Sequence, residues 1–116
     1  MSFLESIDSC SVEYKYVDLQ KWIIIKDKET RLCQMHAVIA GSFVKNQTCT
    51  ILLPYNLQMT GEIFSGAPYC VQVSIDSTEL ISYRIFNPYP NSISVSFSPD
   101  YNYLARFYIS IYGVLE

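Results

Sequence analysis

Glycine, histidine and long apolar runs are scarce in this sequence. Four of the 116 residues are glycine, and they stand apart from one another, so they do not form a glycine-rich phosphate-binding loop. Apolar runs such as Trp22 to Ile25 fall far short of the roughly 20 residues that a membrane-spanning helix needs. No cationic segment followed by an apolar one opens the chain, so we expect neither membrane insertion nor a secretory signal.

Basic residues are too few and too scattered for nucleic-acid binding. Eight lysines and arginines stand against eleven aspartates and glutamates, which gives a formal net charge of −3. Binding to a phosphate backbone depends on clustered positive charge that releases counterions. No run of consecutive basic residues provides such a cluster. We therefore expect no nucleic-acid partner.

The four cysteines lack a metal-binding or redox spacing. None of Cys10, Cys33, Cys49 and Cys70 belongs to a C-x-x-C pair. We interpret them as small apolar side chains on the strands of a protein made in a reducing compartment, with a disulfide pair as the alternative. Cys33 and His36 are three positions apart, but on a strand such residues point to opposite faces. The sequence predicts no metal site and no cofactor.

Catalytic groupings are also missing from the sequence pattern. His36 is the sole histidine, and its place in the middle of a predicted strand favours a sheet residue over a general base. Glycoside hydrolysis requires two facing carboxylates, and most of the acids that could serve lie near predicted turns. These acids are Glu62, Asp76, Glu79 and Asp100. We expect no catalytic residue and a non-enzymatic protein.

Alternating apolar and polar residues predict a chain made of β-strands. Half of the residues are hydrophobic and 15% are aromatic, and the turn signals are spaced as in sandwiches and barrels. We predict an all-β fold for residues 11–116, an antiparallel β-sandwich or jelly-roll-like knob of about nine strands. Residues 1–10 are a short leader in this interpretation, either a helical turn or the end of a stalk. The expected strands are 11–16, 22–26, 31–44, 49–53, 60–64, 69–75, 79–86, 91–98 and 106–113.

Two segments near the C-terminus alternate most clearly. Residues 92–98 alternate three apolar residues with four serines, and residues 107–112 alternate Phe and Ile with Tyr and Ser. We predict that the turn 99–102 joins them as a hairpin, each strand with one buried and one solvated face. Gly41 predicts a bulge in the long third strand. The apolar, half-aromatic face of the first strand is Val12, Tyr14 and Tyr16.

An excess of tyrosine provides the candidate binding site. Sugars stack on the amphipathic ring of tyrosine, while asparagine side chains hydrogen-bond to their hydroxyl groups. The loop 87–91 holds a tyrosine between two prolines and two asparagines, and the next turn along the chain is also rich in tyrosine. The candidate glycan-binding residues are Asn87, Tyr89, Asn91, Tyr101, Asn102 and Tyr103. Burial of these aromatics against one another or against a neighbouring subunit is the alternative interpretation.

The last strand carries bulky residues on both of its faces. Tyr108 and Tyr112 lie opposite Phe107, Ile109 and Ile111. A small sandwich has one inner face per sheet, so a second apolar face favours contact with a partner. We predict that Tyr108 and Tyr112 lie in a subunit interface of a symmetric homo-oligomer.

The order of these features resembles a known family. The opening segment 13–26, the Thr-x-x-Leu-Pro step at 50–54, the segment 73–80 and the closing tyrosine-rich strand follow the strand order and punctuation of bacteriophage tail-fibre C-terminal tips. These tips are receptor-binding heads. The resemblance covers about nine-tenths of the chain.

The resemblance implies a homotrimeric β-sandwich knob that recognises a bacterial surface carbohydrate. It also implies a location in the virion, at the phage tail, for which no signal peptide is needed. Without it, the sequence indicates only cytoplasmic expression. The alternatives are a structural fibre or baseplate module that binds only protein and, third, a polysaccharide hydrolase that uses paired carboxylates.

Overall fold

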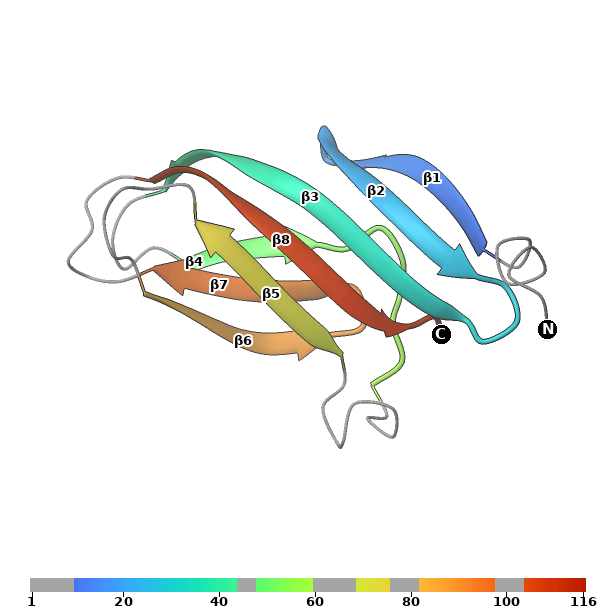
Figure 1. Ribbon diagram of the computed structural model, residues 1–116. Helices are drawn as coiled ribbons and strands as arrows, with labels where there is room; N and C mark the ends of the chain where they lie inside the picture. Colours follow the sequence, from blue (N-terminus) through green and yellow to red (C-terminus); the bar gives the residue numbers. More distant parts are fainter. Residues whose placement is uncertain (1–9, 44–47, 60–68, 76–81, 98–103) are drawn as a thin grey trace.

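The computed structural model describes residues 10–43, 48–59, 69–75, 82–97 and 104–116. Within these ranges the chain forms eight strands and no helix, and the strands lie in two antiparallel sheets (Figure 1). The predicted all-β fold is confirmed, and the strand expected over 60–64 lies outside the described residues. The strands are β1 (Cys10–Val17), β2 (Gln20–Asp27), β3 (Leu32–Phe43), β4 (Thr48–Leu52), β5 (Cys70–Ile75), β6 (Tyr83–Tyr89), β7 (Ser92–Phe97) and β8 (Leu104–Val114).

The larger sheet has five strands in the order β1-β2-β3-β8-β5. Strands β1 and β2 pair along their whole length, from Cys10↔Asp27 to Val17↔Gln20. The turn between them therefore has two residues, Asp18 and Leu19, with φ angles of 49° and 66°. Positive φ at both positions is what a two-residue hairpin turn requires for its twist to match that of the strands.

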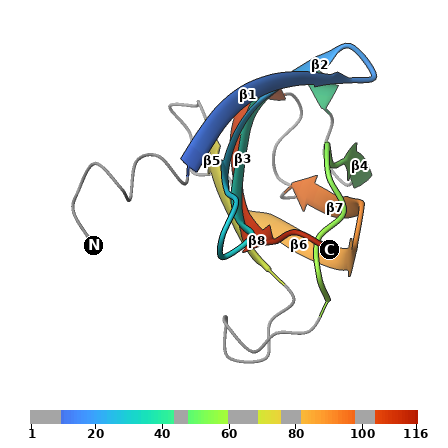
Figure 2. The ribbon, with the colours of Figure 1, turned by 90° about the vertical axis from the view of Figure 1, so that its right-hand side faces the viewer.

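The smaller sheet has three strands in the order β4-β7-β6. Its central strand, β7, pairs with β4 through Ile93↔Ile51 and with β6 through Val95↔Ile85. The larger sheet curves over this smaller one and encloses the space between them (Figure 2). The register of β6 shifts between Phe86 and Tyr89, where a proline cannot donate to the ladder.

The predicted hairpin of the two C-terminal strands is wrong, because they belong to different sheets. Strand β7 pairs with β4 and β6, whereas β8 pairs with β3 and β5. The apolar faces of the two strands meet across the core. The rings of Phe97 and Phe107 pack there with centroids 5.1 Å apart. Alternation predicted the buried side of each strand correctly, but it does not specify the neighbouring strand.

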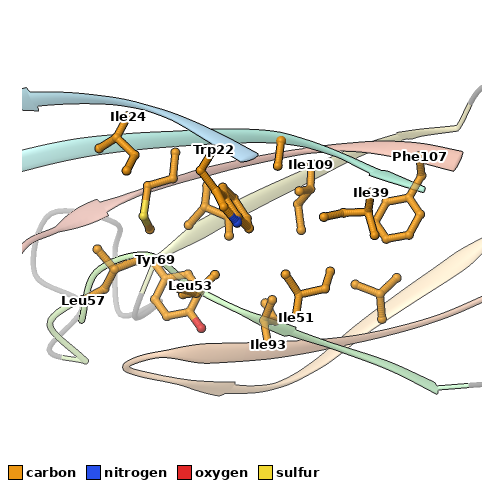
Figure 3. Close-up of a cluster of buried hydrophobic side chains, with 14 of the residues drawn as sticks. Trp22, Ile24, Ile39, Ile51, Leu53, Leu57, Tyr69, Ile93, Phe107 and Ile109 are labelled. Carbon is orange, nitrogen blue, oxygen red and sulfur yellow. The ribbon is translucent and has the colours of Figure 1, made fainter. Parts of the chain in front are cut away.

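The core lies between the facing sides of the two sheets (Figure 3). Trp22 and Phe107 are its largest members, and both are fully buried. Each large apolar side chain in this position stabilises the fold by about 1.5–3 kcal/mol relative to exposure. The other core residues are Ile24, Cys33, Met35, Ala37, Ile39, Ile51, Leu53, Leu57, Tyr69, Ile93, Val95, Phe97, Ile109 and Ile111.

Two local departures from plain strand pairing shape the sandwich. The register of β3 against β8 shifts between Ala40 and Phe43, where Gly41 predicted a bulge. Near the other end of β8, Gly113 lies so close to Leu57 that an added Cβ would stand 2.9 Å from a methyl group of the leucine. The absence of a side chain at Gly113 lets the segment after β4 close this end of the core.

The expected solvation of one strand face also needs correction. Ser94 was predicted on a wet face, but it is 8% exposed because it sits on the central strand with Thr50 and Phe86 as neighbours. In β1 the apolar face, which includes Tyr14 and Tyr16, points away from the core. It is the face with Glu13 and Lys15 that turns towards the segment after β4.

Candidate functional site

The five-stranded sheet has a second face, directed away from the core, which we call the outer face. One row of cross-strand neighbours on it runs through Tyr14, Ile23, His36, Ser110 and Gln72. Apolar side chains on this face remain open to solvent over a contiguous area, which is typical of an interaction surface. The most exposed of them are Val12 (64%), Tyr14 (64%), Tyr16 (66%), Val38 (43%), Ile23 (41%), Leu32 (40%) and Tyr108 (39%).

Both tyrosines that were predicted at a subunit interface lie on the outer face. Tyr108 neighbours Val38, and Tyr112 neighbours Gln34 on the adjoining strand. Tyr112 is half-buried because its ring meets that of His36 edge-on, with centroids 5.9 Å apart. The structure therefore places Tyr108 and Tyr112 on the same face of the sheet. Their contact with a partner stays a prediction.

His36 is a sheet residue with partners, as the sequence indicated. Its Nδ1 lies 2.9 Å from the Ser110 hydroxyl and its Nε2 lies 3.4 Å from the Gln34 side-chain oxygen. The Ser110 hydroxyl is the one potential nucleophile in these contacts, and no carboxylate takes part in them. The imidazole therefore belongs to the polar centre of the outer face.

A hollow of about 450 Å³ opens on the outer face near the β1–β2 turn. Its walls are mainly apolar, with Gln20, Lys21, His36 and Ser110 as the polar lining residues, so it suits an apolar side chain better than a charged ligand. The residues around it are Gln20, Lys21, Ile23, His36, Ala37, Val38, Tyr108, Ile109 and Ser110.

Among the described residues, charged side chains occupy only the margins of the outer face. Strand alternation places Lys21, Asp27 and Arg106 there, towards the ends of their strands. Lys21 lies over the ring of Tyr14, with its Nζ 4.7 Å from the ring centroid. The middle of the face carries no charge at these strand positions, which lowers the desolvation cost of covering it.

The β6–β7 turn presents Tyr89, which is 56% exposed, and the exposed Asn91. The buried Tyr69 donates hydrogen bonds from its hydroxyl to the backbone oxygens of Tyr89 (2.8 Å) and Ser92 (3.1 Å). The backbone N–H of Leu53 donates to the Asn91 carbonyl at 2.8 Å. Burial raises the pKa of Tyr69 to about 12, so this hydroxyl remains a donor at neutral pH. Hydrogen bonds from Tyr69 and Leu53 thus hold the turn, and the ring of Tyr89 remains exposed to solvent.

The other predicted glycan residues cannot be assigned to this turn. The backbone at Asn87 belongs to β6, and its side chain is outside the description. Tyr101, Asn102 and Tyr103 lie outside the described residues, as do Glu62, Asp76, Glu79 and Asp100. Strand β7 separates the end of the Tyr89 turn from Phe97, which precedes the other tyrosine-rich segment, by about 17 Å. Their part in one common site stays a prediction.

Sequence reasoning missed a polar cluster on the inner side of β1. Tyr55 donates a hydrogen bond to the Glu13 carboxylate, which also pairs with Lys26 at 3.3 Å. Lys15 Nζ lies 4.3 Å from the centroid of the Tyr55 ring and donates to the Pro54 carbonyl at 2.9 Å. The cluster ties β1 to the segment after β4. The alternation of charged with aromatic residues in 12–16 was the signal for it.

These contacts change how the members of the cluster titrate. The hydrogen bond from Tyr55 holds the pKa of Glu13 below its usual value, with Lys26 acting in the same direction against the opposing effect of burial. Burial tends to lower the pKa of Lys26, but its bonds to Tyr55 and Glu13 outweigh this and raise it. The cluster is therefore most complete when Glu13 is ionised and Lys26 is protonated.

The four cysteines are free thiols. Cys33 fits the interpretation of a buried apolar side chain, and burial raises its pKa to about 11. Cys10 is exposed at the start of β1 and does not fit it. Among the described residues, no three His, Cys, Asp or Glu side chains come together as metal ligands. The same residues include no helix of the kind that could cross a membrane.

The fold is similar to a solved tail-fibre structure. The comparison is with the C-terminal fragment, residues 323–691, of the R2 pyocin fibre of P. aeruginosa. The TM-score is 0.59 at 10% sequence identity, and the match covers 89% of this chain and 26% of the fibre fragment. No protein-family model and no curated protein sequence matches the chain. The predicted resemblance to a tail-fibre domain is confirmed at the level of fold.

Proposed function

We propose that the chain is a non-enzymatic, tail-fibre-like module that forms a homotrimer through its outer face and binds a bacterial surface carbohydrate. The observation that carries the proposal is the exposed apolar outer face on a fold shared with a pyocin fibre. In this proposal the module resides in a virion at the phage tail, where an oligomeric fibre meets the host.

Assembly through the outer face follows from its size and chemistry. Five strands about 4.8 Å apart, with the shortest six residues long, form a surface of roughly 20 by 20 Å. At the length of the shortest strand this is roughly 400 Å², about half of the roughly 800 Å² that each partner buries in a standard interface, and the longer strands β1, β2, β3 and β8 add to it. Apolar groups gain about 25 cal/mol for each Å² removed from water. Tyr108 and Tyr112 then contact a neighbouring copy.

Carbohydrate binding is assigned to the β6–β7 turn. Tyr89 offers an aromatic face for stacking, and Asn91 beside it can donate and accept hydrogen bonds. The turn is fixed by Tyr69, Leu53 and two flanking prolines, so binding orders little additional chain. A rigid aromatic platform keeps the entropic cost of binding low.

The experiment for the carbohydrate proposal uses a bacterial polysaccharide array. Tyr89→Ala should reduce binding about tenfold, the equivalent of roughly 1.4 kcal/mol, without lowering the melting temperature. Tyr83→Ala is the matched control because Tyr83 is 42% exposed on the same strand. Equal binding by Tyr89→Ala and the unchanged protein would remove Tyr89 from the site. No binding by the unchanged protein to any glycan would favour a fibre module that binds only protein.

A further inference from the structure

Leu19, at the tip of the β1–β2 hairpin, combines two unfavourable features. Its side chain is 97% exposed, and its backbone has a φ angle of 66°. A bulky residue in the left-handed region is an outlier, since two-residue hairpin turns prefer Asn or Gly there. The isolated chain gains almost nothing from this leucine, because so exposed a side chain buries no apolar area. Such a combination points to a contact made outside the single chain.

A matching recess lies next to the turn. The hollow of about 450 Å³ on the outer face includes Gln20 and Lys21, the residues that directly follow Leu19. Ile23, Val38 and Tyr108 contribute its apolar surfaces. The chain's own Leu19 does not enter the hollow, as its exposure shows. An apolar projection and an apolar recess thus lie side by side on one molecule. Within the single chain the projection is not buried and Leu19 does not fill the recess.

We propose that Leu19 of one copy inserts into the outer-face hollow of the next copy. The inference rests on the proposed homotrimer and specifies a contact between its neighbouring copies. The contact joins the projection of one copy to the recess of the next, and a three-fold rotation can repeat it until the ring closes. Among the residues around the hollow only Lys21 carries a fixed charge, and the middle of the outer face adds none, so identical copies meet with little like-charge repulsion.

Substitution at Leu19 separates assembly from folding. Leu19→Asn and Leu19→Gly both suit a positive φ angle, so each should leave the hairpin intact and keep or raise the stability of the single chain. Both remove the projecting side chain and should weaken association about 10- to 100-fold per contact. The control is Leu52→Thr, because Leu52 is 44% exposed on the three-stranded sheet. It should leave association unchanged. Sedimentation equilibrium measures all four proteins.

Photocrosslinking identifies the occupant of the hollow. A benzoyl-phenylalanine at position 19, in a mixture of ¹⁴N- and ¹⁵N-labelled copies, should form crosslinks between differently labelled chains. The crosslinked peptides should contain Ile23, Val38 or Tyr108. Crosslinks confined to one chain, or directed to other segments, would overturn the proposal.

The outcomes separate the two proposals. If the unchanged protein is trimeric and Leu19→Asn associates with the same dissociation constant, the Leu19 contact is wrong and the proposed trimer stands. If the unchanged protein is a monomer, the proposed assembly fails and the Leu19 contact fails with it.

Discussion

The two outward surfaces of this sandwich differ in chemistry although they cover the same core. On the three-stranded sheet the outward positions are mostly serine and threonine, and Arg84 lies over the ring of Phe86 at 5.2 Å. On the five-stranded sheet the outward positions include exposed Val12, Tyr14 and Val38. Hydroxyl side chains are suited to water, whereas contiguous apolar ones are suited to a partner. In the proposed assembly the three-stranded side is free and the five-stranded side is covered.

The distribution of apolar residues in the two sheets agrees with this division. The smaller sheet places most of its apolar residues on the core side, with Leu52 and Phe86 as exceptions on the outward side. The continuous apolar run 22–25 in β2 instead divides between both sides of the larger sheet: Trp22 and Ile24 are buried, and Ile23 is 41% exposed. A strand with two apolar sides is typical of a sheet covered on both.

A charge introduced on each of the two surfaces should show the largest difference between them in its effect on association. Val38→Asp places a carboxylate in the proposed interface, where burial without a partner is costly, and should weaken association by at least about 1,000-fold. Thr50→Asp makes the equivalent change on the three-stranded sheet and should leave association unchanged. Light scattering over a dilution series measures both. Equal dissociation constants for the two variants would show that the outer face is not the interface.

Two adjacent residues of β8 test the inner and outer sides of one strand. Phe107 is fully buried and Tyr108 is 39% exposed. Phe107→Ala should lower the free energy of unfolding by about 3–5 kcal/mol, because it leaves a cavity in the core. Tyr108→Ala should lower it by less than about 1 kcal/mol when the chain is monomeric. Urea denaturation at low protein concentration gives both values, and similar losses would contradict the assignment of faces.

Acid should lower the stability of the fold slightly, through the polar cluster on the inner side of β1. Because the pKa of Glu13 is lowered in the folded chain, its contribution to stability is present above the usual value of 4.5 and is lost as pH falls below it. The loss should stay under about 1 kcal/mol, since the group is near the surface. Tyr55→Phe should reduce this loss of stability at acid pH. Tyr14→Phe, on the other side of β1, should leave it unchanged. Identical profiles for the two variants would refute the assignment.

The sequence predicted those features that depend on local pattern. Alternation identified Ile93 and Val95 as buried and set Tyr108 on the side opposite Phe107, because the side-chain period of a strand is two wherever the strand lies. It could not show that β7 and β8 sit in different sheets. That choice depends on contacts across the core, such as the packing of Phe97 on Phe107.

The β1–β2 turn and the Tyr55–Glu13 contact were missed because they depend on geometry that residue types alone do not reveal. Asp18 and Leu19 form a two-residue turn without the Asn or Gly that usually signals one, so neither the tight hairpin nor the exposed leucine was foreseen. Tyr55 meets Glu13 from a segment 42 positions away. Tyr89 was foreseen because two prolines mark its turn in the sequence itself.

The most direct test of the account is the mass of the unchanged protein in solution. Sedimentation equilibrium at micromolar concentration should give the mass of three chains, because the proposed trimer removes the exposed apolar side chains of the outer face from water. The trimer should dissociate to folded single chains in the Val38→Asp variant. A mass of one chain for the unchanged protein at the same concentration would contradict the claim that its outer face holds copies together.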